Sequence, residues 1–120
     1  MNISPIIYEQ CRKTLVQPEM GGILGCDADG NIVAYHFDAT AETDHHNAYT
    51  PDIRQLNEVI RQWYAQDIYF AGFIHTHGFR PRLTCGDIAY AETIKKSCEM
   101  EDCLMMIYVL ATDKFYEYVV

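Results

Sequence analysis

The order of apolar and polar residues divides the chain into segments with helical and strand-like spacing. Apolar residues recur at roughly helical intervals from Pro5 to Leu15, which predicts a first helix. A stripe at three- and four-residue steps from Ile53 to Trp63 predicts a second helix, opened by Thr50 and Pro51. A third helical pattern begins at Thr84.

Strand-like runs occupy the intervals between these helices. Two β-prone runs flank the polar turn sequence DADGN at residues 27–31, which predicts a hairpin. The nearly continuous apolar run IYFAGFIH at 68–75 is typical of a central strand buried on both faces. The runs at 104–110 and 115–120 predict a closing hairpin. The predicted order α-β-β-α-β-α-β-β indicates an α/β sandwich with a mixed sheet.

The segment from residue 40 to 50 is polar and aperiodic, so we expect a surface connection with at most a short strand near Asn47 to Tyr49. It contains the adjacent pair His45 and His46. Adjacent residues rarely chelate one ion together, so these are expected to be surface histidines and not a second metal site.

Length, charge and cysteine usage narrow the classes of protein to consider. A chain of 120 residues that is 49% hydrophobic indicates one globular domain spanning residues 1–120. Its net charge of -8 opposes nucleic-acid binding, and no apolar run is long enough to cross a membrane. Five unpatterned cysteines and an N-terminus without leader features lead us to expect a soluble, cytoplasmic protein. Whether it forms a homodimer stays open.

The segment FIHTHGFRPRLTCGD carries the candidate chemistry. Side chains alternate along a strand, so His75 and His77 face the same way with Cα atoms about 6.6 Å apart. Asp87 follows in the first turn of the third helix. Two imidazoles and one carboxylate, with a fourth position left for water, are a ligand set of catalytic zinc sites. The alternative is structural: Thr84 and Asp87 also have the spacing of a capping box, and the histidines could simply end a strand.

A zinc hydrolase needs a further carboxylate to accept a proton from the attacking water. Glu19 is the candidate because it precedes the glycine-rich strand sequence MGGILG, whose missing side chains would let another segment approach closely. Taken alone, Glu19 is just an acidic residue at the start of a strand, and that ordinary interpretation outweighs the catalytic one.

Three stretches together resemble the JAMM (MPN-type) metallopeptidases in their compact prokaryotic form: PEMGGILG, YTPDIRQLNEVIRQW and FAGFIHTHGFRPRLTCGDIAYA. The family pattern is a Glu on an early strand, then His-x-His, a loop and Ser-x-x-Asp. The resemblance spans nearly the whole domain. It implies a cytidine-deaminase-like/MPN α-β-α sandwich with a mixed central sheet.

The resemblance also implies roles for individual residues. His75, His77 and Asp87 would bind Zn²⁺, Glu19 would act as general base and then general acid, and the hydroxyl of Thr84 would steady the developing oxyanion. The implied reaction is hydrolysis of a peptide or isopeptide bond. The implied substrate is the C-terminal tail of a ubiquitin-like or sulfur-carrier protein.

The loop after His77 departs from the family pattern. Gly78 stands where the family commonly has Pro, and simple counting would put Cys85 in the place of the serine and Ile88 in the place of the aspartate. Because Ile88 cannot bind zinc, a loop shortened by one residue is preferred, which keeps Thr84 in the serine position. The alternative function is a catalytically silent MPN-like module for binding or assembly. Such modules generally lack the metal ligands, so bound zinc would distinguish the two.

Overall fold

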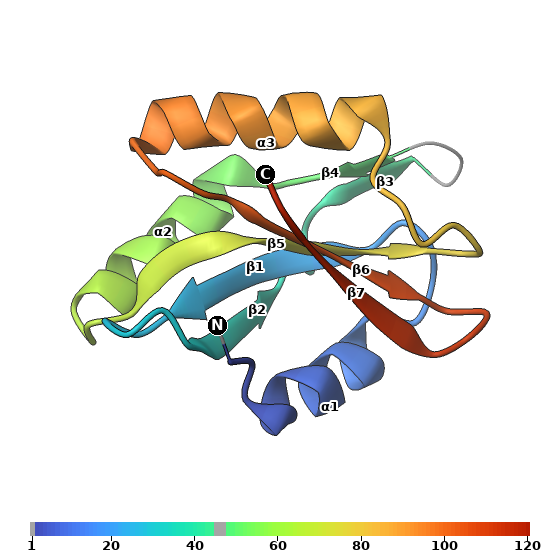
Figure 1. The fold of residues 1–120 in the computed structure, drawn as a ribbon, viewed down its shortest axis with the longest axis horizontal. Helices are drawn as coiled ribbons and strands as arrows, with labels where there is room; N and C mark the ends of the chain where they lie inside the picture. The colour runs from blue at the N-terminus through green and yellow to red at the C-terminus, as the bar shows by residue number, and fades with distance from the viewer. Residues whose placement is uncertain (1, 45–47) are drawn as a thin grey trace.

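Five strands form one mixed sheet in the order β2-β1-β5-β6-β7 in a computed structural model that describes residues 2–44 and 48–120 (Figure 1). The strands are β1 (Gly21–Cys26), β2 (Ile32–Phe37), β5 (Tyr69–His77), β6 (Leu104–Val109) and β7 (Lys114–Val119). The central pair β5 and β6 is parallel, and the other neighbours are antiparallel. The hairpins at both ends follow the predicted turns, and the long β5 is the predicted central strand.

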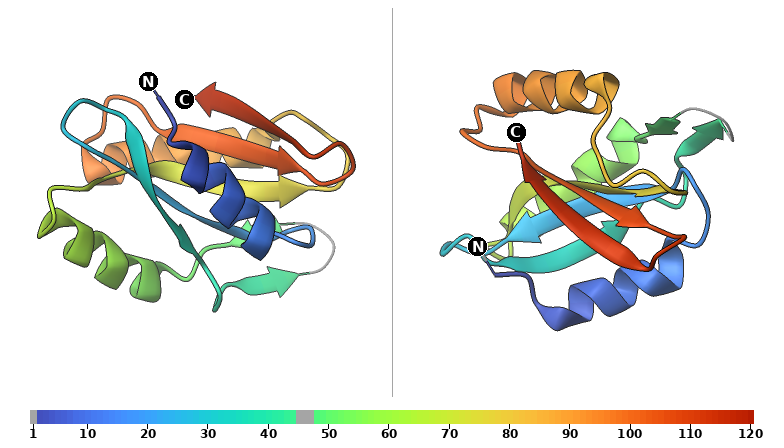
Figure 2. Two further views of the ribbon diagram at one scale, coloured as in Figure 1. Left: turned by 90° about the horizontal axis from the view of Figure 1, so that it is seen from below. Right: turned by 45° about the vertical axis from the view of Figure 1, so that its right-hand side comes forward.

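Three helices cover the two faces of the sheet. They are α1 (Pro5–Thr14), α2 (Ile53–Tyr64) and α3 (Cys85–Cys98). Helix α1 lies on one face, and α2 and α3 lie on the other (Figures 1 and 2). The segment containing α3 links β5 to its parallel neighbour β6, as parallel strands require a crossover. The result is a single α/β domain in which the sheet is covered on both sides.

Each face of the sheet has its own apolar core. Toward α1, Ile7 and Leu15 pack with strand residues such as Ile74 and Met106. Toward α2 and α3, the buried cluster consists of Ile23, Leu56, Trp63, Phe73, Ala91, Cys103 and Met105. Consecutive residues of β5 therefore serve opposite cores: Phe73 faces α2 and α3, and Ile74 faces α1. The same alternation continues through residues 75–77, the last three residues of β5.

The structure differs from the sequence prediction between β2 and α2. Two short strands, β3 (Glu42–Asp44) and β4 (Ala48–Thr50), pair antiparallel in a segment expected to be mainly irregular. Helix α2 begins at Ile53 with Asp52 as N-cap, whose carboxylate accepts from the Gln55 N–H at 3.4 Å. The prediction that Thr50 and Pro51 open this helix was wrong. Thr50 is the last residue of β4, and the Asp52 carboxylate that follows is the better hydrogen-bond acceptor for the first turn of the helix. His45, His46 and Asn47 lie outside the described residues.

Two other residues have structural roles. Trp63 is 9% exposed within the core beneath α2, as its stripe predicted. The Nε2 atom of His36 lies 3.0 Å from the Gln55 amide nitrogen, so this histidine joins β2 to α2. In the described part of the chain no helix has the length and apolarity needed to cross a membrane. All five cysteines are free thiols.

Candidate metal centre

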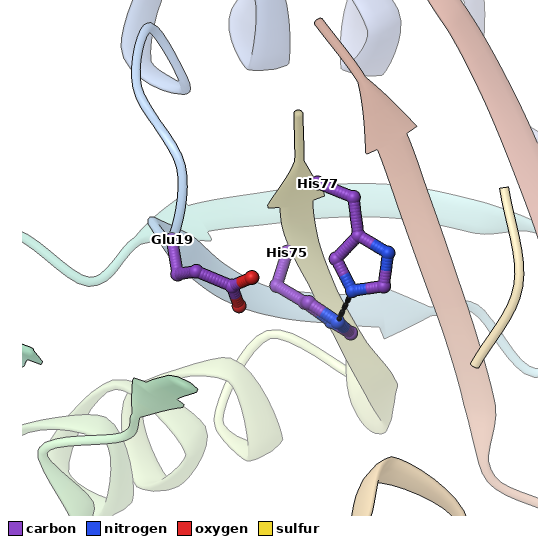
Figure 3. A group of neighbouring side chains, drawn as sticks. All are labelled: Glu19, His75 and His77. Carbon is purple, nitrogen blue, oxygen red and sulfur yellow. Dashed lines mark hydrogen bonds between the residues drawn. The ribbon is translucent and has the colours of Figure 1, made fainter. Parts of the chain in front are cut away.

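His75 and His77 lie at the carboxyl end of β5, and their side chains are on the same face of the sheet. They are 3% and 7% exposed, and their Nε2 atoms lie 2.9 Å apart. Figure 3 shows both imidazoles arising from the same strand and meeting at these nitrogens. Strand alternation thus produces the convergence that the His-x-His spacing predicted.

The tautomer of His77 is set by the loop that follows it. Its Nδ1 lies 2.8 Å from the carbonyl oxygen of Arg80, and a carbonyl can only accept. Nδ1 therefore carries the proton, which leaves the Nε2 lone pair directed at the site. This is the arrangement in which a metal-binding imidazole is oriented by a backbone acceptor.

Asp87 reaches the same point from the start of α3. Its Oδ2 lies 3.5 Å from Nε2 of His75 and 3.9 Å from Nε2 of His77. The same oxygen accepts from the Thr84 N–H at 2.8 Å, and the Thr84 hydroxyl accepts from the Asp87 N–H at 3.0 Å, which completes a capping box. The structural and the chemical interpretations of this motif are therefore compatible.

The electrostatic surroundings favour the ionised form of the Asp87 carboxyl. Partial burial alone would raise its pKa, but the hydrogen bond and charge interaction with His75, together with the hydrogen bonds at Thr84, lower the pKa of Asp87 to about 2. The carboxylate is thus available as an anionic ligand over the whole neutral pH range.

Glu19 reaches the site because β1 runs antiparallel to β5. In this register Gly21 stands opposite His75, so the residues just before β1 lie beside the end of β5. The carboxylate of Glu19 and the ligand nitrogens of His75 and His77 all lie within 4.8 Å of one another. Figure 3 shows the carboxylate directed toward the imidazoles from the segment that enters β1.

Thr76, between the two histidines, fixes the Glu19 segment from the opposite face of the strand. Its side chain is fully buried, donates to the Gln17 carbonyl at 2.6 Å and accepts from the Met20 N–H at 2.9 Å. These bonds hold the backbone on both sides of Glu19. This role was not predicted from the sequence, although a lone hydroxyl in a buried apolar strand was the available signal.

The spacing of the donor atoms fits a tetrahedral zinc ion. Zinc ligands at about 2.0–2.1 Å from the metal lie about 3.3 Å from one another in a tetrahedron. The three separations among His75 Nε2, His77 Nε2 and Asp87 Oδ2 are 2.9, 3.5 and 3.9 Å. These values bracket the tetrahedral spacing, and the nitrogen and oxygen donors suit zinc chemically.

Two carboxylates approach the histidine pair, and their surroundings differ. Asp87 is held by two capping hydrogen bonds with one oxygen within 3.9 Å of both Nε2 atoms. Glu19 lies in the segment before β1, and one of its carboxylate oxygens and one ring nitrogen of each histidine all lie within 4.8 Å of one another. The Asp87 carboxylate, which is constrained by the capping box, suits a metal ligand, and the Glu19 carboxylate beside it suits a group that contacts water next to the metal.

Thr84 and Cys85 are both exposed near the site but occupy different positions. Thr84 is the N-cap of α3, and its hydroxyl contacts Asp87, whereas Cys85 is the first helical residue. Thr84 also lines the two cavities that flank the centre. One cavity, of about 290 Å³, includes His75 and Asp87. The other, of about 280 Å³, includes Glu19 and His77. Thr84 therefore has the position from which a hydroxyl can contact a group spanning both cavities.

A tyrosine from the segment predicted to be irregular forms a wall of the first cavity. The hydroxyl of Tyr49 donates to Oδ2 of Asp38 at 2.8 Å, and this buried carboxylate also accepts from the Asp52 N–H at 2.9 Å. Burial first, and then the Asp38 carboxylate, raise the pKa of Tyr49, which keeps it a donor. A Cβ on Gly21 would lie 2.6 Å from the Tyr49 ring, so this glycine permits the close approach that the glycine-rich strand predicted.

Comparisons with known proteins establish only the fold. No protein-family model matches the sequence, and comparison with curated proteins found no match. Among solved structures, the chain is similar to the solution structure of protein DSY2949 from Desulfitobacterium hafniense, a structural genomics target. The TM-score is 0.66 at 16% identity, over 98% of this chain and 81% of the other.

Proposed function

We propose that this chain is a zinc-dependent metallopeptidase of the JAMM/MPN type, with a cytidine-deaminase-like fold, that hydrolyses a peptide or isopeptide bond. The observation that carries the proposal is the convergence of His75, His77 and Asp87 at near-tetrahedral separations, with Glu19 beside them. His75, His77 and Asp87 would hold one Zn²⁺. When bound, zinc polarises a carbonyl and lowers the pKa of an associated water molecule.

The remaining chemistry is assigned to side chains of the chain. Glu19 accepts a proton from the attacking water and returns it to the nitrogen of the leaving amine, so that it acts as base and then as acid. The Thr84 hydroxyl can donate to the carbonyl oxygen as negative charge develops, while its oxygen accepts from the Asp87 N–H. The burial of His75 and His77 limits the access of competing water to the ligands.

The proposed substrate is the C-terminal tail of a ubiquitin-like or sulfur-carrier protein, which is the substrate class of the resembled family. An extended tail can add to a sheet edge by backbone hydrogen bonds, and the β3–β4 pair, which contains Tyr49, offers such an edge near the site. The proposal includes a cytoplasmic location, in keeping with five free thiols, and no role for nucleic acid, given the charge of -8.

The proposal is tested with zinc-loaded protein and fusions that carry ubiquitin-like or sulfur-carrier tails. We expect the wild-type chain to cleave a fusion, and Glu19→Gln to retain zinc while losing activity by at least about 100-fold, the usual contribution of a positioned general base. Thr84→Val and Thr84→Ser separate loss of the hydroxyl from loss of the side-chain shape. Full activity in Glu19→Gln would remove its assigned role. A wild-type chain that takes up no zinc would instead be a silent binding module.

A further inference from the structure

The loop of residues 78–83 joins the end of β5 to α3, and its first half is held by the turn between β6 and β7. The carbonyl of His77 accepts from the Leu110 N–H at 3.0 Å, and the carbonyl of Gly78 accepts from the Ala111 N–H at 3.1 Å. Both donors directly follow β6. These bonds extend the pairing of β5 with β6 past the ends of the two strands, so the loop leaves the sheet at a defined point.

The second half of the loop presents two consecutive carbonyl groups to two different side chains. The carbonyl of Arg80 lies 2.8 Å from Nδ1 of His77 and accepts its proton. The carbonyl of Pro81 accepts a hydrogen bond from the hydroxyl of Tyr118 in β7. Tyr118 therefore contacts the loop at the peptide group next to the one that orients His77.

The geometry of proline couples these two carbonyl groups. The pyrrolidine ring fixes φ of Pro81, and the peptide groups on both sides are planar. The soft rotation that remains between the Arg80 carbonyl and the Pro81 carbonyl is ψ of Pro81. A hydrogen bond that holds the Pro81 carbonyl therefore restricts the direction of the Arg80 carbonyl as well.

The ring of Tyr118 is itself held by packing. It is partly buried and lies against the apolar cluster toward α2 and α3, to which Met105 of β6 belongs. Met105 stands directly opposite Tyr118 in the pairing of β6 with β7. Leu83, at the end of the loop, packs against the same cluster. The hydroxyl is thus presented to the loop from a fixed side chain.

We infer that Tyr118 is a positioning residue for the metal centre. It acts through Pro81 and Arg80 on the ring of His77, and it helps to keep the proton of that ring on Nδ1. The inference rests on the proposed function, in which Nε2 of His77 binds zinc. Outer partners of metal-binding histidines contribute about tenfold to a hundredfold to metal affinity. Tyr118 acts one peptide group further out, so we expect the lower end of that range.

The inference is tested with Tyr118→Phe, which removes the hydroxyl and keeps the ring. In metal-free protein at about pH 8, where an ordinary imidazole is neutral, a proton–nitrogen correlation NMR spectrum reports which ring nitrogen of His77 carries the proton. Wild type should show the Nδ1–H form, and Tyr118→Phe should show a mixture with the Nε2–H form. Competition with a chelator should give a zinc dissociation constant about tenfold higher in the variant.

Tyr116→Phe is the matched control. Tyr116 lies on the same face of β7 as Tyr118, opposite Ile107, so this variant loses the same hydroxyl from the same strand. It should keep both the tautomer of His77 and the zinc affinity of the wild type. Denaturant unfolding of the two variants compares their stabilities, and the tautomer reports an effect on His77 that a general loss of stability would not produce.

The outcomes separate the positioning role from the proposed function. A Tyr118→Phe protein in which His77 keeps the wild-type tautomer overturns the inference, and so does an equal change in Tyr116→Phe. A wild-type chain that binds no zinc contradicts the proposed function. A tautomer change confined to Tyr118→Phe would still support the action of Tyr118 on His77 in that case.

Discussion

Replacing Thr76 by Val should uncouple Glu19 from the rest of the site. Valine keeps the shape of the side chain but removes the hydroxyl that binds the Gln17 carbonyl and the Met20 N–H, at 2.6 and 2.9 Å. The backbone bond from the Thr76 N–H to the Met20 carbonyl remains, at 2.8 Å, so the start of β1 should stay beside β5. The proposed metal ligands His75 and His77 are not altered.

The expected magnitudes follow from these contacts. A buried polar group left without a partner costs about 1–3 kcal/mol, so we expect Thr76→Val to lower the free energy of unfolding by about 2 kcal/mol. A displacement of about 1 Å in a catalytic group can cost about 100-fold in rate. Since the hydroxyl holds the backbone on both sides of Glu19, the rate constant kcat should fall by about that factor while zinc stoichiometry stays at the wild-type value.

The assay compares Thr76→Val with Thr76→Ser, which keeps the hydroxyl. Denaturant unfolding gives the stability, metal analysis gives the zinc content, and cleavage of a tail fusion gives kcat. Serine should behave nearly as the wild type in all three. Equal stability and equal kcat in the valine and serine variants would refute the argument that this hydroxyl positions Glu19.

Two further perturbations test the local geometry. In metal-free buffer, Asp87→Asn should be less stable than wild type by about 2 kcal/mol near pH 6, because the folded pKa of about 2 lies below the ordinary value of 3.8. This stabilisation is complete above the unfolded pKa and is lost as the pH falls toward 2. The difference in unfolding free energy between Asp87→Asn and wild type should therefore shrink by about half at pH 3. A difference that does not depend on pH would contradict the lowered pKa of Asp87. Gly21→Ala should lower the free energy of unfolding by about 1–3 kcal/mol, because its Cβ would lie 2.6 Å from the Tyr49 ring. Gly86→Ala, whose Cβ would have its nearest contact at 3.6 Å, should be neutral or slightly stabilising in thermal unfolding. Equal melting temperatures for the two alanine variants would show that the Tyr49 ring does not restrict Gly21.

The elements with strong periodicity could be predicted from the sequence, and so could the direction of the histidines. The period of two in β5 is sufficient to put His75 and His77 on one face, and the spacing from Thr84 to Asp87 is sufficient to indicate a capping box. Both are local regularities. They depend on backbone geometry within a few residues, which one sequence reports directly.

The parts that local patterns could not predict depend on pairing between distant segments. Glu19 reaches the site through the register of β1 against β5, and no local pattern encodes that register, so the sequence indicated Glu19 only through the glycine-rich strand that follows it and the family resemblance. Tyr49 lies in a polar, aperiodic segment. Its place in the wall of the cavity depends on a hydrogen bond to Asp38, which precedes β3, whereas Tyr49 itself lies in β4. The Asp52 cap was missed because Pro51 after Thr50 is an equally good helix-start pattern.

The most direct measurement of the central claim is X-ray absorption at the zinc edge of the zinc-loaded protein. Two imidazoles and oxygen ligands should give a first shell of nitrogen and oxygen at about 2.0–2.2 Å, with one zinc per chain that is lost in His75→Ala. Sulfur ligands at about 2.3 Å would show that zinc is held by the free cysteines instead and would contradict the assignment of His75, His77 and Asp87.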